Sequence, residues 1–189
     1  MIFVISGPSG SGKTTLRDKL LKDKELIRGG LTKCVSLTTR PRREGERDKK
    51  DYRFISEEQF KRKLKGKKIL EWTKYLGYHY GTPRDCVEGQ LERCKSIVLC
   101  LDLKGALKIK RIYPHSAINV FIVPPSIKEL RKRIVGRSKA DEDEIRKRLA
   151  VAKKEVASCD IYDYRVVNRN LAQAVTELKK IILKEKSAN

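Results

Sequence analysis

The stretch MIFVISGPSGSGKT, residues 1–14, decides the fold. Its first six residues are mostly apolar and predict a short buried strand. Gly7–Thr14 then match the pattern G-x-x-x-x-G-K-[ST] in full, which is typical of a loop that binds nucleotide phosphates. Leu16, Leu20 and Leu21 follow at helical spacing and predict a helix over residues 14–22. Because a strand precedes the motif and a helix follows it, a phosphate loop is favoured over a glycine-rich turn without a ligand.

Each residue type in this loop suits the chemistry of ATP. Glycine lets backbone N–H groups approach the phosphates, and the following helix directs its positive N-terminal end at them. The ammonium group of Lys13 can reach the β- and γ-phosphates, and the hydroxyl of Thr14 can hold Mg²⁺. We expect the co-substrate ATP to bind at Gly7, Pro8, Ser9, Gly10, Ser11, Gly12, Lys13, Thr14 and Thr15.

Apolar runs farther along the chain predict more strands, at residues 31–37, 96–101, 117–123 and 164–167. Segments with helical spacing of apolar residues lie between most of these runs. Alternation of buried strands and helices predicts an α/β fold. We expect a P-loop three-layer sandwich, with a central parallel sheet between two layers of helices.

The segment of residues 38–82 interrupts this alternation. It is first polar and basic and then rich in aromatic residues, with a capping-box pattern at Ser56-x-x-Gln59 and a turn at Gly77. A length of 189 residues fits one domain. We expect a single domain over residues 1–189, made of a core (1–35, 83–125 and 157–189), a small mixed lobe (about 36–82) and a helical lid (about 126–156).

The formal net charge of +21 is large for this length. It is compatible with nucleic-acid binding, with attraction of polyanionic small substrates, or with well-solvated basic faces. Most lysines are scattered singly or in pairs, which favours the last explanation for most of them. No run of 18 or more apolar residues is present, so we expect no membrane-spanning helix.

The N-terminal strand leads directly into the glycine-rich loop and leaves no room for a signal peptide, so we expect a cytoplasmic protein. The cysteines form no C-x-x-C pair, and His79 and His115 are not spaced as metal ligands. An odd number of cysteines in such a protein predicts reduced, mostly buried thiols. The five are Cys34, Cys86, Cys94, Cys100 and Cys159.

The basic segment suits a phosphorylated acceptor. Arg40, Arg42 and Arg43 lie close to Tyr52 in the sequence, and guanidinium groups bind phosphate oxygens in pairs. On these residues alone, the alternative to a phosphate site is a basic turn that faces solvent and binds no ligand. Asp102 follows the run of residues 96–101, where P-loop proteins often place an acid linked to magnesium, although an ordinary aspartate at the end of a strand would look the same.

The order and spacing of this segment resemble the GMP-binding lobe of the guanylate kinase family. The likeness continues through Gly105, Arg137 and Arg148 and covers the chain from the phosphate loop to about residue 168. The chain departs from the family's usual pattern at residues 47–50, at His79 and at Lys104. The matching residues are Ser36-x-Thr38-Thr39-Arg40-x-x-Arg43-x-Gly45-Glu46, Asp51-Tyr52, Glu71-Trp72, Tyr80-Gly81-Thr82 and Asp102.

The resemblance implies a guanylate kinase, an enzyme of purine nucleotide metabolism that transfers the γ-phosphate of MgATP to GMP, and to dGMP. It implies that Arg40, Arg43, Tyr52 and Tyr80 hold the GMP phosphate and that Ser36, Glu71 and Thr82 read the guanine. Asp102 also belongs to the implied GMP-binding set. The implied catalytic residues are Lys13, Arg40, Arg137 and Arg148, with Mg²⁺ at Thr14.

Three alternatives remain on the sequence alone. A sugar-phosphate kinase on the same scaffold would be expected to lack the guanine-reading set of Ser36, Glu71 and Thr82. A guanylate-kinase-like binding module would be expected to have lost the phosphate loop, which is intact here. A nucleic-acid-binding protein would be expected to carry base-reading or stacking motifs, which we do not find. We expect no membrane partner and no specific nucleic acid; the sequence does not distinguish a monomer from a homo-oligomer.

Overall fold

The computed structural model describes residues 1–136 and 141–188 and places the predicted parallel sheet at the centre. Its five strands pair in the order β2-β7-β1-β8-β9, and every pairing is parallel. The predicted strands at residues 117–123 and 164–167 have the predicted bounds. The strands are β1 (Ile2–Ser6), β2 (Leu31–Lys33), β7 (Ser96–Cys100), β8 (Ala117–Val123) and β9 (Tyr164–Val167).

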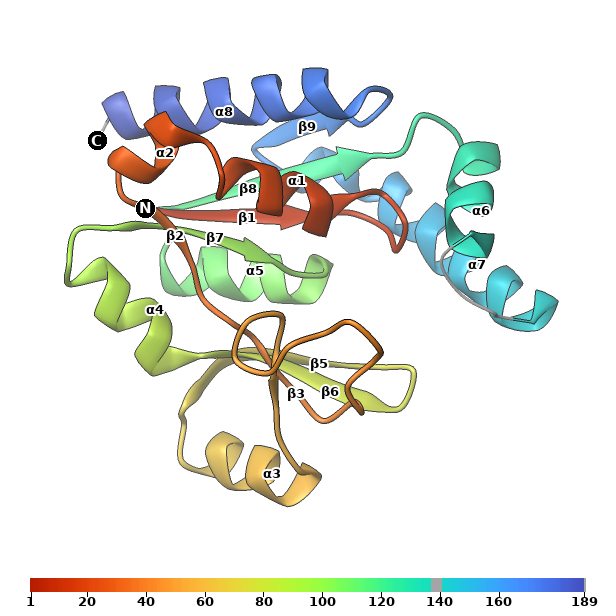
Figure 1. Ribbon diagram of the computed structural model, residues 1–189, viewed down its shortest axis with the longest axis horizontal. Coiled ribbons are helices and arrows are strands. Elements are labelled where there is room, and N and C mark those ends of the chain that lie inside the picture. Colours follow the sequence, from red (N-terminus) through yellow and green to blue (C-terminus); the bar gives the residue numbers. More distant parts are fainter. Residues whose placement is uncertain (137–140, 189) are drawn as a thin grey trace.

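Helices cover both faces of this sheet, which confirms the predicted three layers (Figure 1). One layer contains α1 (Lys13–Leu20), α2 (Lys24–Arg28) and α8 (Leu171–Ser187). The opposite layer contains α4 (Arg84–Leu91) and α5 (Leu103–Ile112). The sequence analysis did not predict α2, whose five residues are too few to show a helical period.

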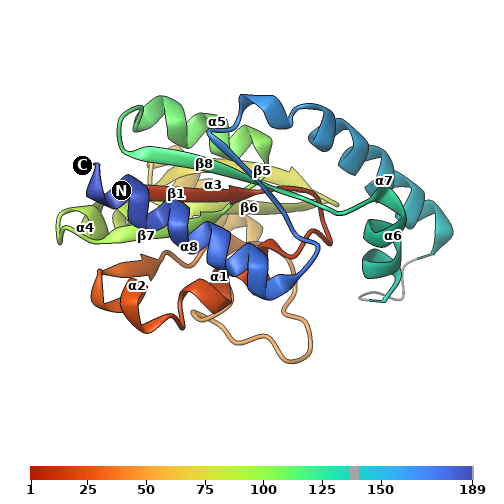
Figure 2. The ribbon, with the colours of Figure 1, turned by 90° about the horizontal axis from the view of Figure 1, so that it is seen from above.

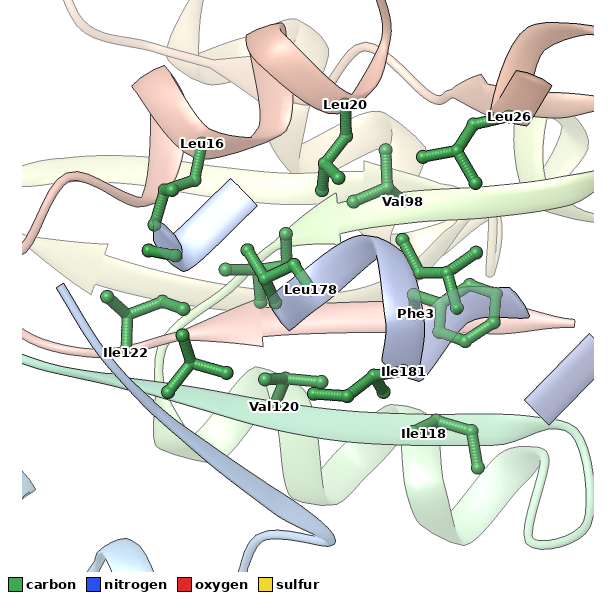
Figure 3. Packing of buried hydrophobic residues seen from close by; sticks show 14 of the residues in the cluster. Phe3, Leu16, Leu20, Leu26, Val98, Ile118, Val120, Ile122, Leu178 and Ile181 are labelled. Atoms are coloured by element: carbon green, nitrogen blue, oxygen red, sulfur yellow. The ribbon is translucent and has the colours of Figure 1, made fainter. Parts of the chain in front are cut away.

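Strand β1 supplies both halves of the core. Phe3 points into a cluster with Leu16 and Leu178 of the covering helices, as Figure 3 shows. Val4 points the other way, into a second cluster that includes Ile109 of α5. Since both faces of the strand are buried, its sequence is a continuous apolar run and not an alternation of apolar and polar residues.

A second, smaller sheet forms the lobe below the core in Figure 1. Its order is β4-β3-β6-β5, and it is mixed because β3 pairs parallel with β4 and antiparallel with β6. Both hydrogen bonds of the predicted capping box begin α3 (Glu57–Lys65), and Gly77 turns the hairpin with a φ of 84°. The strands are β3 (Leu37–Thr38), β4 (Arg53–Phe54), β5 (Ile69–Tyr75) and β6 (Tyr78–Pro83).

The strand predicted over residues 31–37 is in fact two strands in two sheets. Residues 31–33 form β2 of the central sheet, and residues 37–38 form β3 of the lobe. The residues between them carry the chain from the core to the lobe, which an apolar run in the sequence does not reveal.

The prediction of reduced thiols is wrong for two of the five cysteines, Cys34 and Cys86. Cys34, on the segment that leaves the core, forms a disulfide with Cys86 in the first turn of α4, across a Cα–Cα distance of 5.8 Å. The two residues lie 52 positions apart in the sequence, so only the fold brings them together. Among the free thiols, Cys94 is exposed, whereas Cys100 and Cys159 are partly buried.

The segment predicted as a lid is helical. It contains α6 (Ile127–Val135) and α7 (Glu142–Ala157), followed by the short 3₁₀ helix η1 (Cys159–Ile161). Leu130 and Ile145 belong to a small apolar cluster that joins the two helices. Figure 2 shows this pair beyond the carboxyl end of β8, to one side of the sheet. Within the described residues, no helix is both long enough and apolar enough to cross a membrane.

Candidate active site

A cavity of about 520 Å³ opens between the carboxyl edge of the central sheet, the lobe and α7. This is the position at which open parallel α/β sheets bind their ligands. It brings together residues predicted for both substrates: Gly7, Ser9, Gly10, Gly12, Lys13, Thr14, Thr15, Ser36, Arg40, Arg43, Tyr52, Glu71, Tyr80, Asp102 and Arg148. Pro8 and Ser11 lie in the same loop without lining the cavity, and Thr82 contacts a lining residue.

The phosphate loop curls around the N-terminus of α1. Gly10 and Gly12 adopt φ values of 87° and 95°, a region that favours glycine. Asn168, just after β9, donates a hydrogen bond of 2.8 Å to the carbonyl of Ser11, and a Cβ on Gly12 would lie only 2.4 Å from the same side-chain nitrogen. The ammonium group of Lys13 donates to the carbonyls of Gly7 and Pro8 of its own loop. The loop therefore leaves its backbone N–H groups and a positive charge at one end of the cavity.

The opposite end of the cavity carries the arginines of the lobe. Arg40 is only 8% exposed and lies 5.6 Å from the ring centre of Tyr52. Its guanidinium forms an ion pair of 2.7 Å with Glu46, whose other oxygen accepts from the backbone N–H of Arg43. Glu46 therefore orients the Arg40 guanidinium and holds the backbone at Arg43, a role that was not predicted from the sequence.

A buried carboxyl group lines the same cavity. Glu71 on β5 is 5% exposed and pairs in register with Thr82 on β6, which is fully buried. The Thr82 hydroxyl donates a short hydrogen bond to one oxygen of Glu71. Burial raises the pKa of the Glu71 carboxyl to about 7, against the hydrogen bond from Thr82, and the nearby Asp102 charge adds to the increase. The group is therefore poised to accept hydrogen bonds from a ligand that would stabilise its charged form.

Asp102 has a structural role as well as a place in the cavity. Its carboxylate accepts a hydrogen bond of 2.8 Å from the N–H of Gly105 and caps α5. Asp102 thus follows β7, begins α5 and lines the cavity, and its link to magnesium stays a prediction.

Of the two predicted lid arginines, the structure describes only Arg148. Arg148 on α7 is 12% exposed, lines the cavity and pairs with Glu144 one turn earlier on the same helix. Its Nε is buried without a hydrogen-bond partner among the described residues. Arg137 lies outside the described residues.

The structure also adds residues that the sequence analysis missed. Arg17 lines the cavity one turn after Lys13 and donates a hydrogen bond of 2.8 Å to Asp18. Tyr75 lies two residues beyond Thr73 and four beyond Glu71 on β5, and it lines the same cavity as Ser9 of the phosphate loop. Sequence spacing could have identified both residues. Residues four apart on a helix share a face, as Lys13 and Arg17 do, and residues two apart on a strand share a face, as Glu71, Thr73 and Tyr75 do.

The fold and the cavity define a P-loop protein in which arginines of a lobe line the same cavity as the phosphate loop. A sequence model of the guanylate kinase family matches residues 1–185. Guanylate kinases of Bacillus cereus and Caldanaerobacter subterraneus are 40% and 42% identical to this chain, each covering 98% of it and 88% of the relative. The chain belongs to the guanylate kinase family.

Solved structures agree with this assignment. A guanylate kinase from Anaplasma phagocytophilum superimposes with a TM-score of 0.81 at 32% identity, over 98% of this chain and 85% of that chain. A shikimate kinase from Bacteroides thetaiotaomicron, at 13% identity and a TM-score of 0.50, shares only the fold, over 96% of this chain and 98% of that chain.

Proposed function

We propose that this protein transfers the γ-phosphate of MgATP to GMP, and also to dGMP, giving ADP and GDP or dGDP. The observation that carries the proposal is the buried pair of Glu71 and Thr82 in the lobe, across one cavity from an intact phosphate loop. A non-catalytic binding module would not need both the phosphate loop and the pair of Glu71 and Thr82 in one cavity.

Glu71 is proposed to read the guanine. Guanine presents its N1–H and 2-amino groups as adjacent donors, and one carboxylate can accept from both. Adenine has no hydrogen at N1, so it would leave the buried carboxylate unpaired, at a large cost in binding. Thr82 holds one carboxylate oxygen and so orients the group, and Ser36 and Asp102 line the same cavity.

Arg40 and Arg43 are proposed to hold the GMP phosphate, together with the hydroxyls of Tyr52 and Tyr80. These four side chains line one end of the cavity. The ion pair of Arg40 with Glu46 fixes its guanidinium before GMP arrives, which lowers the entropy lost on binding.

The transfer itself needs positioning and charge neutralisation more than proton transfer, because the acceptor phosphate is already ionised near neutral pH. Lys13 would leave its own loop carbonyls for the transferring phosphate. Arg148, and Arg137 by the family resemblance, would approach from the lid and help to exclude water. The core, lobe and lid are proposed to be the parts that move relative to one another.

The side chains that could act as metal ligands fit a Mg²⁺ ion that is held mainly by the phosphates of the substrate. No cluster of three or more histidine, cysteine or acidic side chains suited to a metal occurs among the described residues. Mg²⁺ commonly keeps several waters and takes few protein ligands, and the Thr14 hydroxyl lines the cavity beside Lys13. When bound there, Mg²⁺ would neutralise charge on the nucleotide phosphates.

The experiment is an ADP-release assay with MgATP and a panel of acceptors: GMP, dGMP, AMP, UMP and ribose 5-phosphate. Fast turnover with GMP and dGMP and little with the others is the expected result. Turnover with ribose 5-phosphate and none with GMP would instead support the sugar-phosphate kinase. The cytoplasmic location stays a prediction.

A further inference from the structure

Gly105 lies in the first turn of α5, buried beneath the carboxylate of Glu71. It is not among the glycines with positive φ, so its backbone conformation is open to any residue. Alanine forms helices more readily than glycine does. The backbone therefore gives no reason for glycine at this position.

The space around Gly105 does give a reason. A Cβ at this position would lie 2.8 Å from Oε2 of Glu71, 3.2 Å from Cβ of Leu101 and 3.3 Å from Oδ1 of Asp102. Leu101 is packed in the core, and Asp102 is held by its hydrogen bond to the Gly105 N–H. The contact with Glu71 is also the only one of the three below 3 Å, so the carboxylate is the group that would have to move.

Glu71 is confined from the other side as well. Thr82 donates to its Oε1, while Oε2 is the oxygen that faces Gly105. The carboxylate is thus enclosed between a hydroxyl on β6 and a helix turn that lacks a side chain. A methyl group on that turn would push Oε2 away while Oε1 remains tied to Thr82, which would rotate the plane of the carboxylate.

We propose that Gly105 is a positioning residue for guanine specificity: its missing side chain leaves the space in which Glu71 presents its carboxylate to the base. The inference rests on the proposed role of Glu71 in reading guanine. It adds to that role the claim that α5, an element of the core, sets the orientation of a side chain of the lobe.

The test compares Gly105→Ala with Gly89→Ala. Gly89 is a matched control because it is also helical, on α4, but has nothing within 4 Å of the position of a Cβ. For Gly105→Ala we expect KM for GMP to rise about tenfold to a hundredfold, as for other displacements of about 1 Å in an active site. KM for ATP and the melting temperature should stay near wild type, and the preference for GMP over AMP should fall. Gly89→Ala should match wild type in both KM values and in acceptor preference, and its melting temperature should be equal to or above that of wild type, because alanine favours the helix.

A second pair of variants tests the steric cause. Glu71→Asp shortens the side chain by one methylene and withdraws the carboxylate from Gly105. If the added methyl acts by pushing Glu71, then Gly105→Ala should raise KM for GMP much less in the Glu71→Asp background than in wild type. Equal increases in both backgrounds would overturn the inference, as would an unchanged KM for GMP or an equal rise in KM for ATP. A wild-type protein without any preference for GMP over AMP would instead refute the proposed function itself.

Discussion

At the scale of single residues, the account depends on the Glu71 carboxyl. Composition and spacing could place this residue beside Trp72 on an aromatic-rich strand, and the family resemblance could name it. Neither could predict that it is buried or that its pKa is raised to about 7. Burial against α5, where Gly105 faces the carboxylate, and the charge of Asp102 at the start of the same helix raise this pKa, whereas the hydrogen bond from Thr82 on β6 opposes the increase.

Glu71→Gln should weaken GMP binding and spare ATP binding. The amide keeps the size of the side chain but can accept only through one oxygen, so guanine loses a hydrogen bond to a charged group. Such bonds contribute about 1.5–3 kcal/mol, which corresponds to an increase of about tenfold to a hundredfold in KM for GMP. Steady-state kinetics with each substrate varied in turn would measure both values. An equal loss for ATP and GMP would contradict the role of Glu71 in reading guanine.

GMP affinity should depend on pH through the same group. Because the pKa of Glu71 is about 7, the carboxyl is mostly protonated at pH 6 and mostly ionised at pH 8. Guanine donors require the ionised form, so affinity should rise by about tenfold between these pH values. Titration calorimetry of wild type and Glu71→Gln at each pH separates this effect from ionisation of the GMP phosphate. An equal change of GMP affinity with pH in both proteins would exclude Glu71 as the cause of that change.

At the scale of secondary-structure elements, sequence patterns predicted the features that depend mainly on neighbouring residues, such as a short strand and a helix cap. The strand at residues 164–167 and the capping box of α3 are confirmed as predicted. The short helix α2 was missed, although Asp23 caps it by accepting from two backbone N–H groups. The split of residues 31–37 between two sheets could not be predicted, because no glycine or proline separates the two halves and only the tertiary fold places them in different sheets.

Ser56→Ala should destabilise the protein without changing its chemistry. The substitution removes the hydroxyl that accepts a hydrogen bond of 3.1 Å from the N–H of Gln59 at the start of α3. Loss of such a cap costs about 1 kcal/mol of unfolding free energy. Urea denaturation would measure this, with Ser187→Ala as the control because Ser187 is exposed at the end of α8. If Ser56→Ala and the control lost the same free energy of unfolding, the cap would contribute nothing to stability.

At the scale of the whole molecule, the cavity is made by contacts between segments that are distant in the sequence. Asn168 supports the phosphate loop across 157 positions, and Arg148 of α7 lines the same cavity as Lys13. The sequence analysis could assign these regions to a core, a lobe and a lid. It could not predict the disulfide between Cys34 and Cys86, which joins the two segments where the chain enters and leaves the lobe.

This disulfide should stabilise the folded protein. Closing a loop over a sequence separation of 52 restricts the unfolded chain, which typically contributes about 2–4 kcal/mol. Thermal unfolding with and without dithiothreitol should therefore show a lower melting temperature on reduction. Cys34→Ser should abolish that difference, whereas Cys94→Ser, at an exposed free thiol, should preserve it. A melting temperature that is independent of reductant in the unmodified protein would contradict the prediction.

The most direct test of the central claim is a competition. The protein would receive ATP labelled at the γ-phosphate, with Mg²⁺ and equal concentrations of GMP and AMP, and the labelled products would be separated. The ratio of products gives the ratio of kcat/KM for the two acceptors under identical conditions. We predict label in GDP, in excess over label in ADP by at least about a hundredfold. Equal labelling of the two diphosphates, or label only in inorganic phosphate, would contradict the account.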